Sequence, residues 1–157
     1  MEKISRQLRI LLALQAVILL GGVIFSWRAL FVQFNAFYAL YGDLTRIKDC
    51  VIPNPITTPC FYGSVAFIVA LAWAVVLLRV RSEKSLRYLR NFLIFGVCFA
   101  LTVLAYEAVQ YYYPSFSGPK ISCNPGAHPL KTPCFSGLLF FVMAAVTAVL
   151  ADRKQTE

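Results

Sequence analysis

The chain has 157 residues, of which 59% are hydrophobic and 14% are charged, and its formal net charge is +8. Soluble domains contain about 45–50% apolar and about 25% charged residues. A soluble domain of this length would therefore have too little polar surface to cover itself. The composition argues against an ordinary soluble domain and favours a protein of the lipid bilayer.

Four apolar runs, at 10–27, 61–78, 92–106 and 135–151, reach the length of a membrane-spanning helix, which needs about 20 mostly apolar residues. The first run continues in apolar sequence and is followed by no cleavage site of small residues, so we expect a retained helix rather than a signal peptide. Residues 29–41 fit either an extension of this helix or a separate interfacial helix. The runs predict an all-α integral membrane protein, a single domain over 1–157, with four transmembrane helices at about 10–40, 59–79, 89–113 and 133–152.

Basic residues gather in three short segments that flank these helices. Cytoplasmic segments of membrane proteins carry an excess of Lys and Arg, so this distribution predicts that both termini and the middle link are cytoplasmic. The predicted location is the plasma membrane, multi-pass. Two loops, at 41–58 and 114–132, then face outward. The ten basic residues concerned are Lys3, Arg6, Arg9, Arg79, Arg81, Lys84, Arg87, Arg90, Arg153 and Lys154.

The phrase Thr-Pro-Cys-Phe-x-Gly occurs twice, at 58–63 and at 132–137, each time before an apolar run. Because the following helices align without a gap at the same offset of 74 residues, the sequence predicts an internal duplication. Its halves cover 9–80 and 88–154, each a helix, an outer loop and a second helix. Both halves enter from the same side, so we expect a parallel repeat with a pseudo-two-fold axis along the membrane normal.

The Thr-Pro pairs predict where the second helix of each half begins. Thr58 and Thr132 suit the N-cap, where a side-chain oxygen accepts a hydrogen bond from a first-turn amide. Pro59 and Pro133 suit the first helical position, where no amide hydrogen is needed.

Four of the five cysteines fall in or beside the outer loops, in a compartment where disulfides persist. Four cysteines allow three pairings; we expect Cys50 to pair with Cys60 and Cys123 with Cys134, one disulfide in each half. Alternatively, Cys60 and Cys134 are exchangeable thiols, because the first turn of a helix favours negative charge. The fifth, Cys98, lies inside the third helix, where we expect a buried apolar side chain.

In topology the chain resembles the quinone-linked disulfide-forming membrane proteins, with four helices, cytoplasmic termini and two outward cysteine pairs. That resemblance implies a thiol–disulfide oxidoreductase in which Cys60 and Cys134 react and Cys50 and Cys123 resolve them. The chain departs from that family because it has no Cys-x-x-Cys sequence. A metal site is not expected, since His128 and the outer cysteines lack close ligand spacing.

Arg28 and Glu107 lie toward the outer ends of the first and third helices, and a shift of 79 residues superposes their neighbours. Ionisable groups near hydrocarbon are costly and are usually paired or functional. Two interpretations remain open: both side chains reach the outer interface, or they form an ion pair inside the membrane.

The sequence favours a non-enzymatic scaffold or accessory subunit that presents two disulfide-closed outer loops to a membrane or extracytoplasmic protein, or to a second copy of itself. No cofactor is expected for that function. The first alternative is the thiol–disulfide oxidoreductase, with quinone as cofactor; the second is a small-solute transporter. The lipid bilayer is the expected surrounding and nucleic acid is not an expected partner.

Overall fold

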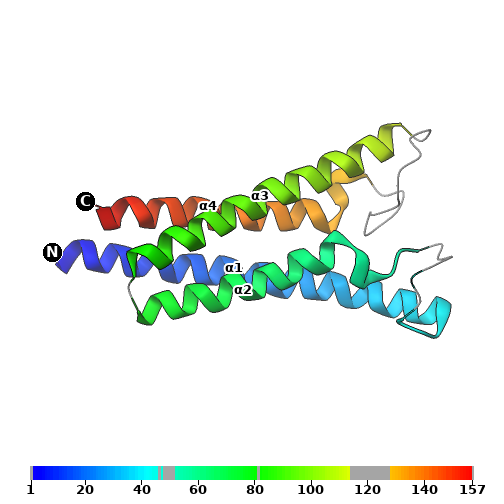
Figure 1. The fold of residues 1–157 in the computed structure, drawn as a ribbon, viewed down its shortest axis with the longest axis horizontal. Helices are drawn as coiled ribbons and strands as arrows, with labels where there is room; N and C mark the ends of the chain where they lie inside the picture. The colour runs from blue at the N-terminus through cyan, green and yellow to red at the C-terminus, as the bar shows by residue number, and fades with distance from the viewer. Residues whose placement is uncertain (1, 46, 48–51, 81, 114–127, 157) are drawn as a thin grey trace.

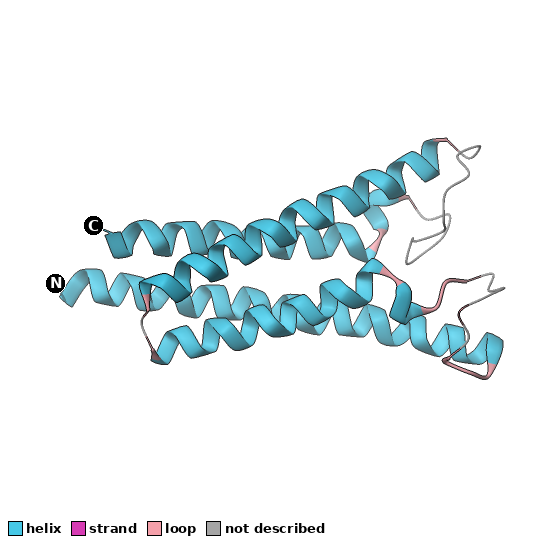
Figure 2. Ribbon diagram, in the orientation of Figure 1, coloured by secondary structure: helices cyan, strands magenta, loops and turns pink. Residues whose placement is uncertain are grey.

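The computed structural model describes residues 2–45, 47, 52–80, 82–113 and 128–156. Within them the chain forms four long helices and two short 3₁₀ turns, and no strand (Figure 2). In chain order the elements are α1 (Glu2–Tyr41), η1 (Pro55–Thr57), α2 (Pro59–Arg79), α3 (Glu83–Tyr112), η2 (Pro129–Lys131) and α4 (Pro133–Thr156).

All four helices are long and apolar enough to cross a membrane, in agreement with the four helices predicted from sequence. The helices run side by side, with both chain termini at one end of the bundle (Figure 1). α1 packs along α2 and α4, and α4 packs along α3, whereas α2 contacts α3 over a shorter stretch. α1 is one continuous helix to Tyr41, so 29–41 is its extension and not a separate helix.

The helix ends follow from local chemistry. α1 stops at Gly42, whose φ of 66° suits glycine because an L side chain is strained there. The amide of Gly42 donates to the carbonyl of Tyr38 at 2.8 Å, which closes the last turn. α3 begins after Ser82, whose hydroxyl accepts from the amide of Ser85.

Two phenylalanine rings stack at the centre of the bundle, where α2 meets α4. The ring centroids of Phe67 and Phe141 are 4.1 Å apart. Each ring lies against a glycine of the neighbouring helix: a Cβ at Gly22 would lie 2.6 Å from Phe67, and one at Gly96 would lie 2.8 Å from Phe141. These two glycines therefore allow the close helix approach that small residues give in membranes.

Burial in the bundle follows an offset of 74 residues, the separation of Cys60 and Cys134. Residues 74 positions apart are buried together in α1 and α3, and again in α2 and α4. Among the buried pairs are Leu12 with Leu86, Leu19 with Leu93, Phe67 with Phe141, Ala70 with Ala144 and Ala74 with Ala148.

Many large apolar side chains lie on the outside of the bundle, among them Ile10, Phe31 and Phe95. A bilayer makes such exposure favourable, because lipid tails are as apolar as these side chains. Cys98 is also exposed, so its expected burial is wrong. The physical reason is that an apolar residue of a spanning helix satisfies its environment by facing lipid as well as by facing the core.

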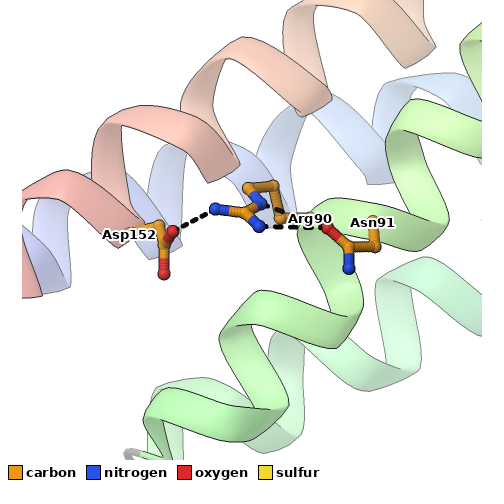
Figure 3. Close-up of polar contacts among 3 residues, drawn as sticks. All are labelled: Arg90, Asn91 and Asp152. Atoms are coloured by element: carbon orange, nitrogen blue, oxygen red, sulfur yellow. Dashed lines mark hydrogen bonds and ion pairs between the residues drawn. The ribbon is translucent and has the colours of Figure 1, made fainter.

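Toward the terminal end of the bundle, one ion pair joins α3 to α4. Arg90 pairs with Asp152, and its guanidinium also donates to Asn91 (Figure 3). Both charged side chains are partly buried, at 28% and 15% exposure. The pair fixes the register of α3 against α4 near the basic end of the molecule.

Candidate functional site

Two similar turns precede α2 and α4. In η1 the side chain of Asn54 accepts from the amide of Ile56 at 3.0 Å, and in η2 Nδ1 of His128 accepts from the amide of Leu130 at 3.3 Å. Asn54 also donates to the carbonyl of Leu44 at 2.7 Å. His128 therefore serves as a turn residue, the counterpart of an asparagine.

Thr58 occupies the N-cap of α2 and Pro59 its first turn, and α4 likewise begins at Pro133 after Thr132. The expected hydrogen bond of the cap is different, however. The Thr58 hydroxyl donates to the carbonyl of Pro55 at 2.7 Å and makes no bond to a first-turn amide. Thr132 donates to Pro129 at 2.8 Å in the same way. Each hydroxyl thus completes the preceding 3₁₀ turn instead of the helix that follows.

These turns bring Cys60 and Cys134 together. Each cysteine is the second residue of its helix, and the two Sγ atoms are 3.4 Å apart. A disulfide bond measures about 2.05 Å, so the sulfurs are in van der Waals contact but not bonded to each other. This meeting of the two halves was not expected, because the predicted pairings stay within one loop.

The predicted disulfides cannot be followed, because Cys50 and Cys123 lie outside the described residues. Cys60 is disulfide-bonded, and Cys134 carries a thiol. A thiol therefore lies 3.4 Å from a disulfide sulfur. Attack of a thiolate on a disulfide sulfur is the elementary step of thiol–disulfide exchange.

A small apolar cavity of ≈ 60 Å³ surrounds the two sulfurs, and all four helices contribute to its wall. We call it the sulfur pocket. Its lining repeats at the 74-residue offset, so the cavity is built from matching residues of the two halves of the chain. The matching pairs are Ser26 with Ala100, Ala29 with Val103, Pro59 with Pro133, Cys60 with Cys134, Gly63 with Gly137, Ser64 with Leu138 and Phe67 with Phe141.

A larger cavity of ≈ 460 Å³ lies between α2 and α3, beside the sulfur pocket; we call it the α2–α3 groove. It shares Pro59, Gly63, Phe99 and Phe141 with the sulfur pocket. Ala66 lines the groove, and the residue 74 positions on is Phe140. Aromatic side chains dominate its wall, with Tyr62, Phe92 and Phe95 in addition to those shared.

The place of Ala66 explains why such a groove forms on this side. Phe140 packs against Phe25 and Phe67, with ring centroids 6.1 and 6.4 Å apart, and it lies close to Gly21. A bulky ring thus fills the space between α4 and α1. At the matching position the alanine side chain leaves the space between α2 and α3 open.

Glu107 is buried beside the cysteine pair, at 4% exposure. Its Oε2 accepts from the Thr132 hydroxyl at 3.0 Å, which shares its single hydrogen with the Pro129 carbonyl, and the carboxyl lies beside the Cys134 thiol. Oε1 is buried with no hydrogen-bond partner among the described residues. A buried carboxyl with spare hydrogen-bonding capacity is costly, and such groups concentrate at functional sites.

Arg28 does not share this environment. Its side chain is exposed, and it forms no ion pair with any residue that the structure describes. Burial follows the 74-residue offset, at which Glu107 corresponds to Gln33. The shift of 79 residues instead matches the exposed Arg28 with the buried Glu107. Of the two interpretations, exposure at the interface suits Arg28 but not Glu107.

Sequence reasoning identified Cys60, Cys134 and Glu107 separately and did not bring them together. It also missed the Gly22–Phe67 and Gly96–Phe141 contacts that frame the pocket. The signal was available, because extending the offset of 74 from the Thr-Pro-Cys-Phe phrase to the first and third helices superposes both glycines and both phenylalanines.

Comparison with known proteins adds no family to this description. No protein-family model, no curated protein and no solved structure matches the chain.

Proposed function

We propose that this protein is a membrane thiol–disulfide oxidoreductase in which Cys60 and Cys134 exchange disulfide bonds and a quinone accepts the electrons. The single observation that carries the proposal is the 3.4 Å separation of the two sulfurs inside an apolar pocket. A structural disulfide needs no second cysteine sulfur in contact with it. An exchanging pair requires that contact, because the attacking sulfur must reach the disulfide.

The exchange balances without an outside reagent. The Cys134 sulfur forms a bond to the Cys60 sulfur, and the bond between Cys60 and its present disulfide partner breaks. The departing sulfur receives the electron pair and takes up a proton. Oxidation of a partner dithiol then requires a quinone, which accepts two electrons and two protons as one disulfide forms and becomes the quinol.

The α2–α3 groove supports a quinone as the electron acceptor. It is apolar, lined with aromatic rings and continuous with the sulfur pocket through shared residues. Ligand sites are concave and mostly apolar, and membrane quinones are apolar molecules with a planar ring. A quinone in the groove would reach Cys60 without leaving the membrane interior.

Two further features of the chain support the topology that this function needs. The matching burial at 74 residues supports a duplicated hairpin. Basic residues flank the helices at the terminal end, including Arg6, Arg79 and Arg153, which supports cytoplasmic termini in a plasma membrane. The cysteine pair would then lie toward the outer face, where a dithiol partner could be oxidised.

The test is a disulfide map of the protein in native membranes, with Cys98→Ser as the background to remove the exposed thiol of α3. Membranes are treated with a short-chain ubiquinone, quenched with acid, alkylated and digested. We expect a peptide pair joined through Cys60 and Cys134 that grows with quinone and disappears in Cys134→Ser. If Cys134 is alkylated completely, with and without quinone, the proposal is wrong.

A scaffold that presents the outer turns to a protein partner is the second candidate. Ile56 and Leu130, at matching positions of η1 and η2, are 43% and 58% exposed. A matched pair of exposed apolar side chains on ordered turns suits a contact surface. Under this function Ile56→Ser with Leu130→Ser abolishes partner capture by crosslinking while Cys134→Ser does not, and the reverse result favours the oxidoreductase.

A further inference from the structure

We propose that Glu107 takes the proton from the Cys134 thiol as Cys134 attacks Cys60, and that Glu107 thereby makes Cys134 the nucleophile of the pair. This inference rests on the proposed exchange between the two sulfurs. It assigns unequal roles to two cysteines that occupy matching positions in the sulfur pocket.

The first observation is the contact itself. The Glu107 carboxyl lies beside the Cys134 thiol, and its Oε2 accepts from the hydroxyl of Thr132, two residues before Cys134, at 3.0 Å. Oε1 has no hydrogen-bond partner in the part of the chain that the structure describes. The carboxyl is thus held in place by one bond and retains lone pairs for a proton. A general base must lie next to the proton that it removes, and a fixed carboxyl with a free oxygen beside the thiol meets that requirement.

The second observation is asymmetry. The sulfur pocket is lined by residues that match at 74 positions, but Glu107 corresponds to Gln33. The Thr58 hydroxyl, which corresponds to that of Thr132, donates to Pro55 alone among the described residues. An ionisable side chain is therefore present beside Cys134 where an uncharged amide stands in the first half. This difference makes the chemical surroundings of the two sulfurs unequal.

The chemistry requires such a base. Only a thiolate attacks a disulfide, so the Cys134 thiol must lose its proton as the new bond forms. Transfer of the proton to Glu107 during the attack avoids releasing it to bulk water. The Cys134 sulfur then bonds to Cys60, the bond from Cys60 to its present partner breaks, and the departing sulfur takes a proton from Glu107 or from water.

Other titratable groups at this end of the bundle are less well placed. On α2, Cys60 is the sulfur under attack. At η2 the His128 ring packs on Tyr111 of α3, with centroids 5.3 Å apart, and Nδ1 accepts from the Leu130 amide. Arg28 of α1 is exposed. Glu107 is therefore the group that can take this proton directly.

The test measures the rate of exchange against pH for the full chain in liposomes, with Cys98→Ser in all samples. Protein held in acid is moved to buffers from about pH 6 to about pH 8 and quenched in acid, and the Cys60–Cys134 peptide is quantified. The wild-type rate at each pH is the reference for the variants. In Glu107→Gln the proton must go to water, so the rate at pH 6 should fall about 100-fold and rise about tenfold per pH unit.

Thr132→Val and Thr58→Val are matched variants, because both remove a hydroxyl that donates to a proline carbonyl, but only Thr132 holds Glu107. We expect slower exchange in Thr132→Val alone, and this comparison decides the case if Glu107→Gln does not accumulate. Equal rates in the two threonine variants, or an unchanged rate and pH profile in Glu107→Gln, overturn the role of Glu107 while leaving exchange intact. Failure of the wild type to form the peptide contradicts the proposed function itself, and this inference with it.

Discussion

The two helical hairpins, α1 with α2 and α3 with α4, match closely in packing and differ in chemistry. Both begin their second helix with Pro-Cys-Phe after a 3₁₀ turn, and both place a phenylalanine against a glycine of the first helix. Yet Glu107 has Gln33 as its counterpart, and Phe140 has Ala66. The stacked Phe67 and Phe141 and the glycines they contact are alike in both hairpins, whereas Glu107, beside Cys134, and Ala66, at the groove, have unlike counterparts.

These differences make the two cysteines chemically unequal although the two hairpins share their central packing. Matching packing brings the two sulfurs together near the centre of the pocket. One carboxyl and one missing ring then distinguish the Cys134 side from the Cys60 side. We therefore expect substitutions at matched packing positions to destabilise the protein by similar amounts in the two hairpins. Substitutions at unmatched positions should affect only the hairpin that carries them.

The largest expected effect is on packing. Gly22→Ala and Gly96→Ala would place a Cβ within 2.6 and 2.8 Å of a buried phenylalanine ring. Each should lower the free energy of unfolding by about 1–3 kcal/mol, because well-packed interiors resist added volume. Unfolding in mixed micelles measures the loss. Gly63→Ala is the control, since its Cβ would meet no atom within 4 Å. A loss of stability in only one of the two glycine variants would show that the two hairpins do not pack alike.

The groove should respond to Ala66→Phe, which gives α2 the ring that α4 has at Phe140. Filling the groove should lower the rate of quinone-dependent disulfide formation about tenfold, as expected when a ligand loses well-packed contact worth about 1.4 kcal/mol. Stopped-flow measurement of quinol formation detects it. Ala72→Phe places the same ring on an exposed face of α2 and should leave the rate unchanged. Equal rates in both variants would show that quinone does not use the groove.

The Arg90–Asp152 ion pair belongs to the second hairpin alone, because the matching residues are Ala16 and Leu78. Arg90→Ala should destabilise the protein by about 1 kcal/mol, near the upper end for exposed pairs, since both side chains are partly buried. The same micelle unfolding assay measures it. Arg87→Ala removes an exposed charge from the neighbouring turn and should have no effect.

The smallest effect concerns the turn after α1. Hydrogen bonds from the backbone amide and the hydroxyl of Thr45 lower the pKa of the Asp43 carboxyl below its usual value of 3.8. A lowered pKa in the folded state stabilises the turn above the unfolded pKa, and that contribution disappears as pH falls through the folded pKa. Thr45→Val should raise the pKa of Asp43 toward 3.8, as read from its carboxyl NMR shift. No change would show that the turn does not form in the membrane protein.

The four helices could be predicted from sequence because bilayer thickness fixes the length of an apolar run, and Thr-Pro marks a helix start. The burial of Cys98 could not, since a spanning helix can turn an apolar residue to lipid. The meeting of Cys60 with Cys134 is a contact between segments 74 residues apart. The expectation that each disulfide forms within one loop does not predict this contact. A duplication does suggest it, because equivalent residues of the two halves can meet at the axis that relates them.

Mass spectrometry of the acid-quenched protein from native membranes tests whether the Cys60 and Cys134 sulfurs exchange disulfide bonds. We expect a peptide pair linked through Cys60 and Cys134, increased by quinone and lost in Cys134→Ser. Cys134 recovered wholly as the alkylated thiol, whatever the quinone content of the membrane, would contradict it.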